Sequence, residues 1–141
     1  MNTIFNCDII ELKKINNRAG NISVVENDLS IPFKINRVYY IYDVPGGSDR
    51  GGHAHKTLEQ FLVAVSGAFD IIIDDGRNKK SIRLDRPYIA LHIKKGIWRE
   101  MRNFTSGSVC MVMASLPYDK EDYIDNYKEF KKFKIDENKR S

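Results

Sequence analysis

His53 and His55 are the residues of this chain whose type and spacing are best suited to chemistry. They stand two positions apart in Gly52-His53-Ala54-His55, within a run that is typical of a β-strand. Because successive side chains of a strand point to opposite faces, the two imidazoles are expected to share one face and converge. An imidazole binds or releases a proton near neutral pH. Such a pair, facing a cavity, is therefore suited to proton transfer.

Charged residues surround this pair in the sequence. Continued alternation along the strand places Glu59 on the same face as His53 and His55. Two histidines and a carboxylate are a ligand set for Fe(II) or Zn(II), so a metal site is one alternative. Arg50 and Lys56 flank the histidines, and each is suited either to holding a phosphate or to lying as a solvated surface charge.

A second strand offers groups that recognise anions. Arg37 and Tyr39 alternate onto one face of Arg37-Val38-Tyr39-Tyr40-Ile41-Tyr42. If that face is the inner one, Tyr39 can donate a hydrogen bond and Arg37 can meet an anion. The opposite orientation of the strand would turn Tyr40 and Tyr42 inward, so both orientations remain open at this point.

The rest of the chain predicts the elements that must position these side chains. Short runs rich in Val, Ile, Tyr and Phe alternate with Gly, Pro, Asn and Asp turns, which is typical of an all-β sandwich or barrel. The expected strands are Ile4–Ile10, Ile22–Glu26, Arg37–Val44, Gly52–Val65, Phe69–Asp74, Lys80–Leu84, Ile89–Ile93, Arg99–Phe104 and Val109–Ala114.

The C-terminal part has a different pattern. Within residues 118–130, Tyr123, Tyr127 and Phe130 fall at helical spacing, with acidic residues early and lysines late. This predicts one amphipathic helix whose aromatic stripe packs against the barrel. Residues 134–141 are polar and are expected to form a frayed tail.

Length and composition favour a single water-soluble domain spanning residues 1–133. The chain has 141 residues, of which 42% are hydrophobic and 30% charged. Its net charge of +4 comes largely from the Lys-rich C-terminal end, and it has no basic recognition helix or zinc finger, so nucleic-acid binding is not expected. No stretch has the length of a membrane span and the N-terminus lacks a signal-peptide pattern, so we expect a cytoplasmic protein.

The histidine segment resembles the first motif of the cupin superfamily. Gly47, His53, His55, Glu59 and a later glycine, Gly67, follow the cupin order, with one extra residue before the last. The resemblance implies a jelly-roll β-barrel, here with a short C-terminal helix. In the second cupin motif a histidine usually completes a metal site.

Arg99 stands at the position of that histidine in Gly96-Ile97-Trp98-Arg99-Glu100-Met101. A guanidinium stays protonated and has no lone pair for a cation, so this residue disfavours a metal ion beside His53 and His55.

Longer segments resemble the nucleotide-sugar 3,4-ketoisomerases, which are cupin enzymes acting on dTDP-4-keto-6-deoxyglucose. The matching runs are RVYYIYD at Arg37–Asp43, RGGHAHKTLEQ at Arg50–Gln60, DDG at Asp74–Gly76, GIWREM at Gly96–Met101 and YDKEDYIDNYKEF at Tyr118–Phe130. Gly52 departs from the pattern, because relatives are expected to have a bulkier residue there.

The resemblance implies a homodimer that needs no metal or other cofactor and that exchanges N-terminal strands between subunits. It also implies that the product passes to a pyridoxal-phosphate aminotransferase, in the biosynthesis of 3-amino-3,6-dideoxyhexoses for surface glycans.

The same resemblance implies catalysis by His53 and His55, which would move a proton from C3 to C4 of the sugar through an enediol. Tyr39 and Arg99 are then candidates to stabilise the oxyanion. Arg50 is the first candidate to hold the diphosphate, and the other expected substrate-binding residues are Arg37, Lys56 and Glu59. Both C4 configurations, gluco and galacto, are compatible with this chemistry.

Two other functions remain open from the residues alone. One is a metal-dependent cupin oxygenase or isomerase that uses His53, His55 and Glu59. The other is a non-catalytic cupin that binds a nucleotide sugar.

Overall fold

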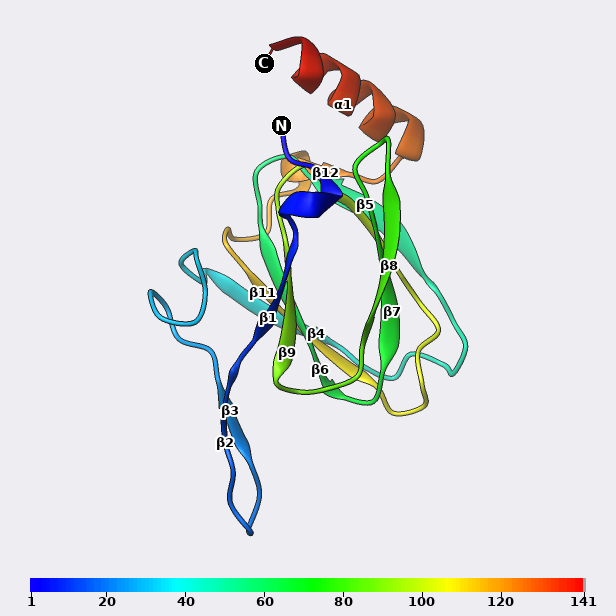
Figure 1. Ribbon diagram of the computed structural model, residues 1–141. Coiled ribbons are helices and arrows are strands. Elements are labelled where there is room, and N and C mark those ends of the chain that lie inside the picture. The colour runs from blue at the N-terminus through cyan, green and yellow to red at the C-terminus, as the bar shows by residue number, and fades with distance from the viewer. Residues whose placement is uncertain (141) are drawn as a thin grey trace.

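The computed structural model describes residues 1–140, which form two five-stranded antiparallel sheets with a helix at the C-terminus (Figure 1). The first sheet has the order β1 (Asp8–Glu11), β9 (Ile89–Ile93), β6 (Gln60–Ser66), β11 (Val109–Ala114) and β4 (Arg37–Ile41). The second has the order β12 (Tyr123–Ile124), β5 (Arg50–His55), β10 (Trp98–Arg102), β7 (Phe69–Asp74) and β8 (Lys79–Leu84). No helix among these residues is long and apolar enough to cross a membrane.

The main core lies between the two sheets. Leu62 and Leu91 of the first sheet pack in one buried cluster with Ile71, Ile73 and Met101 of the second. Burying apolar side chains between two faces is the main favourable contribution to such a fold. The expected all-β jelly-roll barrel with a C-terminal helix is confirmed, and β7, β9 and β11 have the predicted bounds.

Four other predicted strands, Ile22–Glu26, Arg37–Val44, Lys80–Leu84 and Arg99–Phe104, differ from the structure by one to three residues at one or both ends. The two remaining predicted strands are wrong to a greater extent. The expected strand Gly52–Val65 is interrupted after His55 by a turn. Asp122 holds this turn, because its carboxylate accepts hydrogen bonds from the backbone N–H groups of Thr57 (2.9 Å) and Leu58 (3.1 Å). The expected strand Ile4–Ile10 begins instead with a 3₁₀ helix, η1 (Ile4–Asn6), which has a capping box at Thr3.

The N-terminal segment covers the outer face of the first sheet and then leaves the barrel. Leu12 and Ile31 pack on Phe61, Val63 and Met113 of that face. Between them, β2 (Lys13–Ile15) and β3 (Ile22–Val24) form a hairpin that projects away from the barrel (Figure 1).

The C-terminal helix differs from the prediction at both ends. Helix α1 runs from Tyr127 to Arg140, so the expected frayed tail is helical through Arg140. It begins late because the segment before it forms a 3₁₀ helix, η2 (Lys120–Asp122), and then pairs with β5 as strand β12. Its C-terminal half is held by Lys134, which is only 5% exposed. Ser141 lies outside the residues that the structure describes.

Helix α1 packs on the outer face of β5 and β10. Phe130 lies in a buried cluster with Ala54, Trp98 and Ile124. The small residues on this face of β5 make the close packing possible: a Cβ atom at Gly52 would overlap the indole of Trp98. The opposite, inner face of β5 bears the two histidines.

Candidate active site

Strand β4 turns Arg37 and Tyr39 inward. Tyr39 packs against the main core, whereas Val38 and Tyr40 are 54% and 63% exposed. Of the two orientations of this strand, the one with Arg37 and Tyr39 on the inner face is therefore correct. It follows from pairing with β11, where Tyr39 lies opposite the buried Val112.

The histidines converge as predicted. Arg99 of β10 lies opposite His53, and Tyr123 of β12 lies opposite His55. The two imidazole centroids are 4.9 Å apart with nearly perpendicular rings, and the Tyr123 ring is 4.4 Å from His55 and 5.2 Å from His53. Both Nε2 atoms are buried and have no hydrogen-bond partner within residues 1–140. A buried polar atom without a partner is rare in native proteins and is often explained by a function or a missing ligand.

Both histidines are held in their neutral form. Burial lowers the pKa of His53 from 6.5 to about 2, with a further contribution from the positive charge of Arg99. Burial and Arg99 also lower the pKa of His55, to about 4, although Asp122 acts in the opposite direction. A neutral imidazole can accept a proton, so each is prepared to act as a base rather than as an acid in the free protein.

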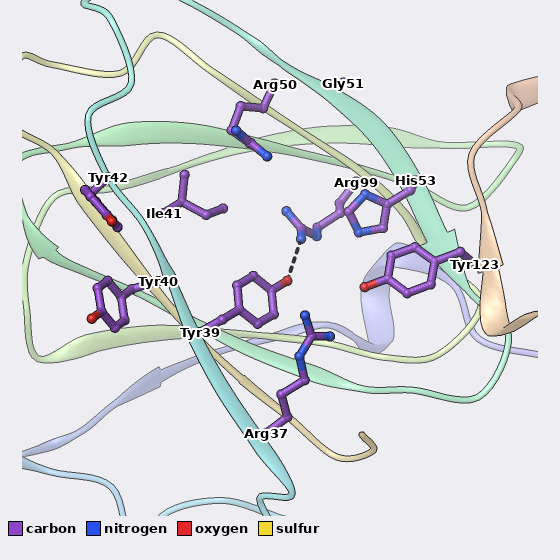
Figure 2. Close-up of a pocket in the computed structure, with 10 residues that line it drawn as sticks. All are labelled: Arg37, Tyr39, Tyr40, Ile41, Tyr42, Arg50, Gly51, His53, Arg99 and Tyr123. Carbon is purple, nitrogen blue, oxygen red and sulfur yellow. Dashed lines mark hydrogen bonds between the residues drawn. The ribbon is translucent and has the colours of Figure 1, made fainter. Parts of the chain in front are cut away.

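Basic and aromatic residues line a cavity of about 470 Å³ beside His53 (Figure 2). The side chains that point into it in Figure 2 include those of Arg37, Tyr39, Arg99 and Tyr123, and Arg50 lies at its edge. No carboxylate of the described chain is among the lining residues. Arginines gathered without a counter-charge fit an anionic ligand.

Tyr39 connects several of these groups. Its hydroxyl oxygen accepts hydrogen bonds from Arg99 (3.2 Å) and from the side-chain amide of Gln60 (3.1 Å). The guanidinium carbon of Arg37 lies 4.5 Å from the centroid of the Tyr39 ring and 5.2 Å from that of the Tyr118 ring. The Nη1 atom of Arg37 is buried without a hydrogen-bond partner in the described part of the chain, as is the Nε atom of Arg99.

Glu59 does not join the histidines, which corrects the expected shared face. The turn after His55 ends the alternation, and the Glu59 carboxylate lies 2.9 Å from His92 Nε2. No three His, Cys, Asp or Glu residues in the described ranges are grouped so that they could hold a metal ion. The ligand set that a metal-dependent cupin would need here is therefore not assembled.

Lys56 is exposed and is not one of the lining residues found for the cavity. Its backbone N–H donates to the carbonyl oxygen of Asp122 (2.9 Å), in the turn that ends β5. Of the two cations that flank the histidines, the structure brings only Arg50 to the site.

Known proteins with the same sequence pattern and fold are sugar isomerases. The family described as "FdtA: WxcM-like, C-terminal" matches residues 5–135. The TDP-4-oxo-6-deoxy-α-D-glucose-3,4-oxoisomerase of Aneurinibacillus thermoaerophilus is 46% identical over 125 residues, which are 89% of this chain and 90% of that protein. The chain belongs to the sugar 3,4-ketoisomerase family.

Solved structures of ketoisomerases superpose over nearly the whole chain. The WlaRB TDP-quinovose 3,4-ketoisomerase of Campylobacter jejuni is 48% identical, with a TM-score of 0.86 over 90% of this chain and 98% of its own. A histidine-to-asparagine mutant of the 3,4-ketoisomerase QdtA of Thermoanaerobacterium thermosaccharolyticum was solved in complex with TDP-4-keto-6-deoxyglucose. It is 36% identical, with a TM-score of 0.91 over 95% of this chain and 97% of its own.

Sequence reasoning did not identify two residues at this site, one that lines the cavity and one that supports a lining residue. Tyr123 was assigned to a helical stripe, yet it is a strand residue beside both histidines. Gln60 is a polar residue at a position that alternates with the core residues Leu62 and Ala64, and this signal could have identified it. The unusual Gly52 is explained by Trp98, whose indole fills the space of a larger side chain.

Proposed function

We propose that this protein converts dTDP-4-keto-6-deoxyglucose into a dTDP-3-keto-6-deoxyhexose. The observation that best supports this is the pair of neutral, unpaired imidazoles beside an arginine-lined cavity. The imidazoles suit the removal of a proton from carbon, and the arginines suit a nucleoside diphosphate. The relatives that share this fold are named as 3,4-ketoisomerases.

The reaction needs only proton transfers. The C4 carbonyl acidifies the C3 hydrogen, a neutral imidazole removes it as a proton, and the electron pair forms the C3–C4 double bond of an enediol. A proton is then delivered to C4, while the C3 hydroxyl loses its proton and becomes the new carbonyl. The C4 oxygen gains a proton, so atoms and charge balance without an oxidant or a reductant.

The site suggests a role for each residue. His53 lines the cavity and His55 lies next to it, so they form the proton-transfer pair. Tyr39 and Arg99, which are joined by a hydrogen bond, are suited to stabilise the negative charge on the sugar oxygen. Arg50 and Arg37 are the anchors for the diphosphate.

A metal-dependent oxygenase or isomerase has little support in this geometry, because the Glu59 carboxylate pairs with His92 and not with His53 or His55. A non-catalytic binding protein would have no need for two unpaired imidazoles at its ligand.

We also propose a cytoplasmic homodimer that supplies its product to a 3-aminotransferase in surface-glycan biosynthesis. Strand β1 pairs with β9 of its own chain, so the segment available for exchange is the projecting hairpin β2–β3. Its exposed Ile15 and Ile22 favour contact with a second subunit.

Incubation of the purified protein with dTDP-4-keto-6-deoxyglucose and a pyridoxal-phosphate 3-aminotransferase tests the proposal. We expect NMR of the product to show an amino group at C3, and the same spectrum gives the configuration at C4. Recovery of unchanged 4-keto sugar, with an active aminotransferase confirmed on authentic 3-keto substrate, would reject the proposed activity.

A further inference from the structure

Gln60 is a buried amide at the edge of the candidate active site. It is the first residue of β6, it is 2% exposed, and it shares the inner face of the sheet with Leu62 and Ala64. The residue opposite it on β11 is Ala114, whose methyl group leaves room for a long side chain to reach toward β4. A polar group in such a position has to be hydrogen-bonded, and its partner is Tyr39.

The hydrogen bonds at the Tyr39 hydroxyl determine in which direction this group can donate its own hydrogen. A phenol oxygen offers two lone pairs as acceptors and one hydrogen as a donor. Arg99 donates to this oxygen at 3.2 Å and Gln60 Nε2 donates to it at 3.1 Å. The hydrogen of Tyr39 has no acceptor among residues 1–140, and Tyr39 lines the cavity. The remaining role of the hydroxyl is therefore to donate into the cavity.

We infer that Gln60 is a positioning residue, which occupies a lone pair of the Tyr39 hydroxyl and so directs its hydrogen toward the substrate oxygen that becomes negative. This inference rests on the proposed ketoisomerase function. Arg99 alone would leave one lone pair of the tyrosine oxygen open and its hydrogen free to turn away from the cavity. With both lone pairs filled, the donor is oriented before the substrate arrives, which is how a preorganised oxyanion site stabilises charge.

The polarity of residue 60 can be changed without changing its size. In Gln60→Glu the side chain keeps its shape, but an ionised carboxylate can only accept, so it would draw the tyrosine hydrogen away from the substrate. In Gln60→Met the volume is similar and the hydrogen bond is lost. Tyr39→Phe removes the hydroxyl itself. Each change at residue 60 is made in the native chain and in the Tyr39→Phe background.

We expect Tyr39→Phe to lower kcat by about 10²–10³-fold, which is the usual effect of losing one oxyanion donor. Gln60→Glu should lower kcat by a similar factor of about 10²-fold, with KM changed by less than about threefold, because the donor acts mainly in the transition state. Gln60→Met should lose only about tenfold, the usual size of one neutral hydrogen bond. Binding of dTDP by calorimetry confirms that each variant is folded.

The double variants decide whether residue 60 acts through Tyr39. We expect Gln60→Met to have no further effect on kcat in the Tyr39→Phe background, since the hydroxyl it acts on is absent. An additive loss in this double variant would overturn the inference, as would wild-type kcat in Gln60→Glu beside an impaired Tyr39→Phe enzyme. Wild-type kcat in Tyr39→Phe would instead reject the proposed role of Tyr39. If Gln60→Glu does not fold, the Gln60→Met pair gives the same comparison.

Discussion

The positive charge of the arginines in the cavity has two effects, one on the histidines and one on an anionic ligand. Their positive charge lowers the pKa of His53 and His55 in the free protein, in addition to the effect of burial. The same charge attracts a diphosphate, whose negative charge opposes the effect of the arginines on the imidazoles. We therefore expect binding of the nucleotide sugar to raise the pKa of His53, which would make its imidazole a stronger base when the substrate is present.

Arg50 and Lys56 allow a matched test of the diphosphate anchor. Arg50 lines the cavity, whereas Lys56 is exposed in the turn beyond β5. We expect Arg50→Ala to weaken dTDP binding by about 10- to 100-fold, the usual range for a hydrogen bond to a charged group, and Lys56→Ala to change it by less than about twofold. Calorimetric titration with dTDP measures both. Equal losses in the two variants would contradict the assignment of Arg50.

The lowered histidine pKa values predict the acid limb of the activity. An unperturbed histidine would lose its basic form below pH 6.5, but the pKa of His55 is lowered to about 4. We expect kcat/KM, which reports the free enzyme, to begin its fall below pH 6.5 and to have its midpoint closer to 4. A midpoint at or above 6.5 in the rate profile would show that the histidines are not held neutral.

The lowered pKa values of His53 and His55 also make the stability of the fold depend on pH. Below pH 6.5 the unfolded chain binds protons that the folded histidines do not, so the free energy of unfolding decreases as the pH falls from 6.5 toward 4. Circular dichroism at each pH therefore has to accompany the rate measurements, to separate loss of catalysis from loss of fold.

At the scale of elements, helix α1 is connected to the strand that bears the histidines. The Lys134 ammonium donates to the backbone carbonyl oxygens of Asn2 and Gly96, each at 2.9 Å. Gly96 in turn donates its backbone N–H to the carbonyl oxygen of His55 at 2.7 Å. One buried side chain thus joins the N-terminus, the loop before β10 and the end of β5.

Replacement of Lys134 tests this connection. Lys134→Met keeps most of the buried volume but leaves the carbonyl oxygens of Asn2 and Gly96 without their donor. We expect the free energy of unfolding to fall by about 1–3 kcal/mol, the cost of leaving buried polar groups unsatisfied. Lys132→Met, at an exposed position of the same helix, should change it by less than about 0.5 kcal/mol. Urea unfolding of both variants measures the difference, and equal stability of the two would show that the Lys134 contacts add nothing.

The sequence predicted those elements whose pattern is local. The short apolar runs Phe69–Asp74 and Val109–Ala114, bounded by turn residues, gave strands with correct bounds. The spacing of His53 and His55 was enough to place them side by side. Contacts between distant segments were not visible. The carboxylate of Asp122 ends the strand after His55 and so turns Glu59 away.

Tyr123 shows the same limit for the C-terminal part. Its spacing from Tyr127 and Phe130 is helical, but pairing with β5 draws it into a strand. Local helical propensity is a weak preference that tertiary pairing can override. Similarly, the orientation of β4 depended on its neighbour β11, so Arg37 and Tyr39 could be assigned to the cavity only from the structure.

At the scale of the whole molecule, the first 30 residues of the chain bear several exposed apolar side chains, in β1, in the projecting hairpin and in the turn that follows it. Ile9, Ile22 and Leu29 are 56%, 57% and 77% exposed. We expect the protein to sediment as a dimer at micromolar concentration, with these residues buried between subunits. Ile22→Asp, in the projecting hairpin, should shift it toward monomer, whereas Lys128→Asp on the exposed side of α1 should not. A wild-type monomer would contradict the proposed dimer.

His53 and His55 are the residues that we propose transfer a proton between C3 and C4 of the sugar. Solvent deuterium in the product, measured together with turnover in the native protein and in the His53→Asn and His55→Asn variants, tests this role. Asparagine keeps polarity and approximate size but cannot exchange a proton near neutral pH. We predict deuterium at C4 of the product in D₂O, and a loss of label and product together, by about 10²–10⁴-fold, in each variant that still binds dTDP. Wild-type turnover in both variants would contradict the proposed role of His53 and His55, because the histidine pair would then be structural.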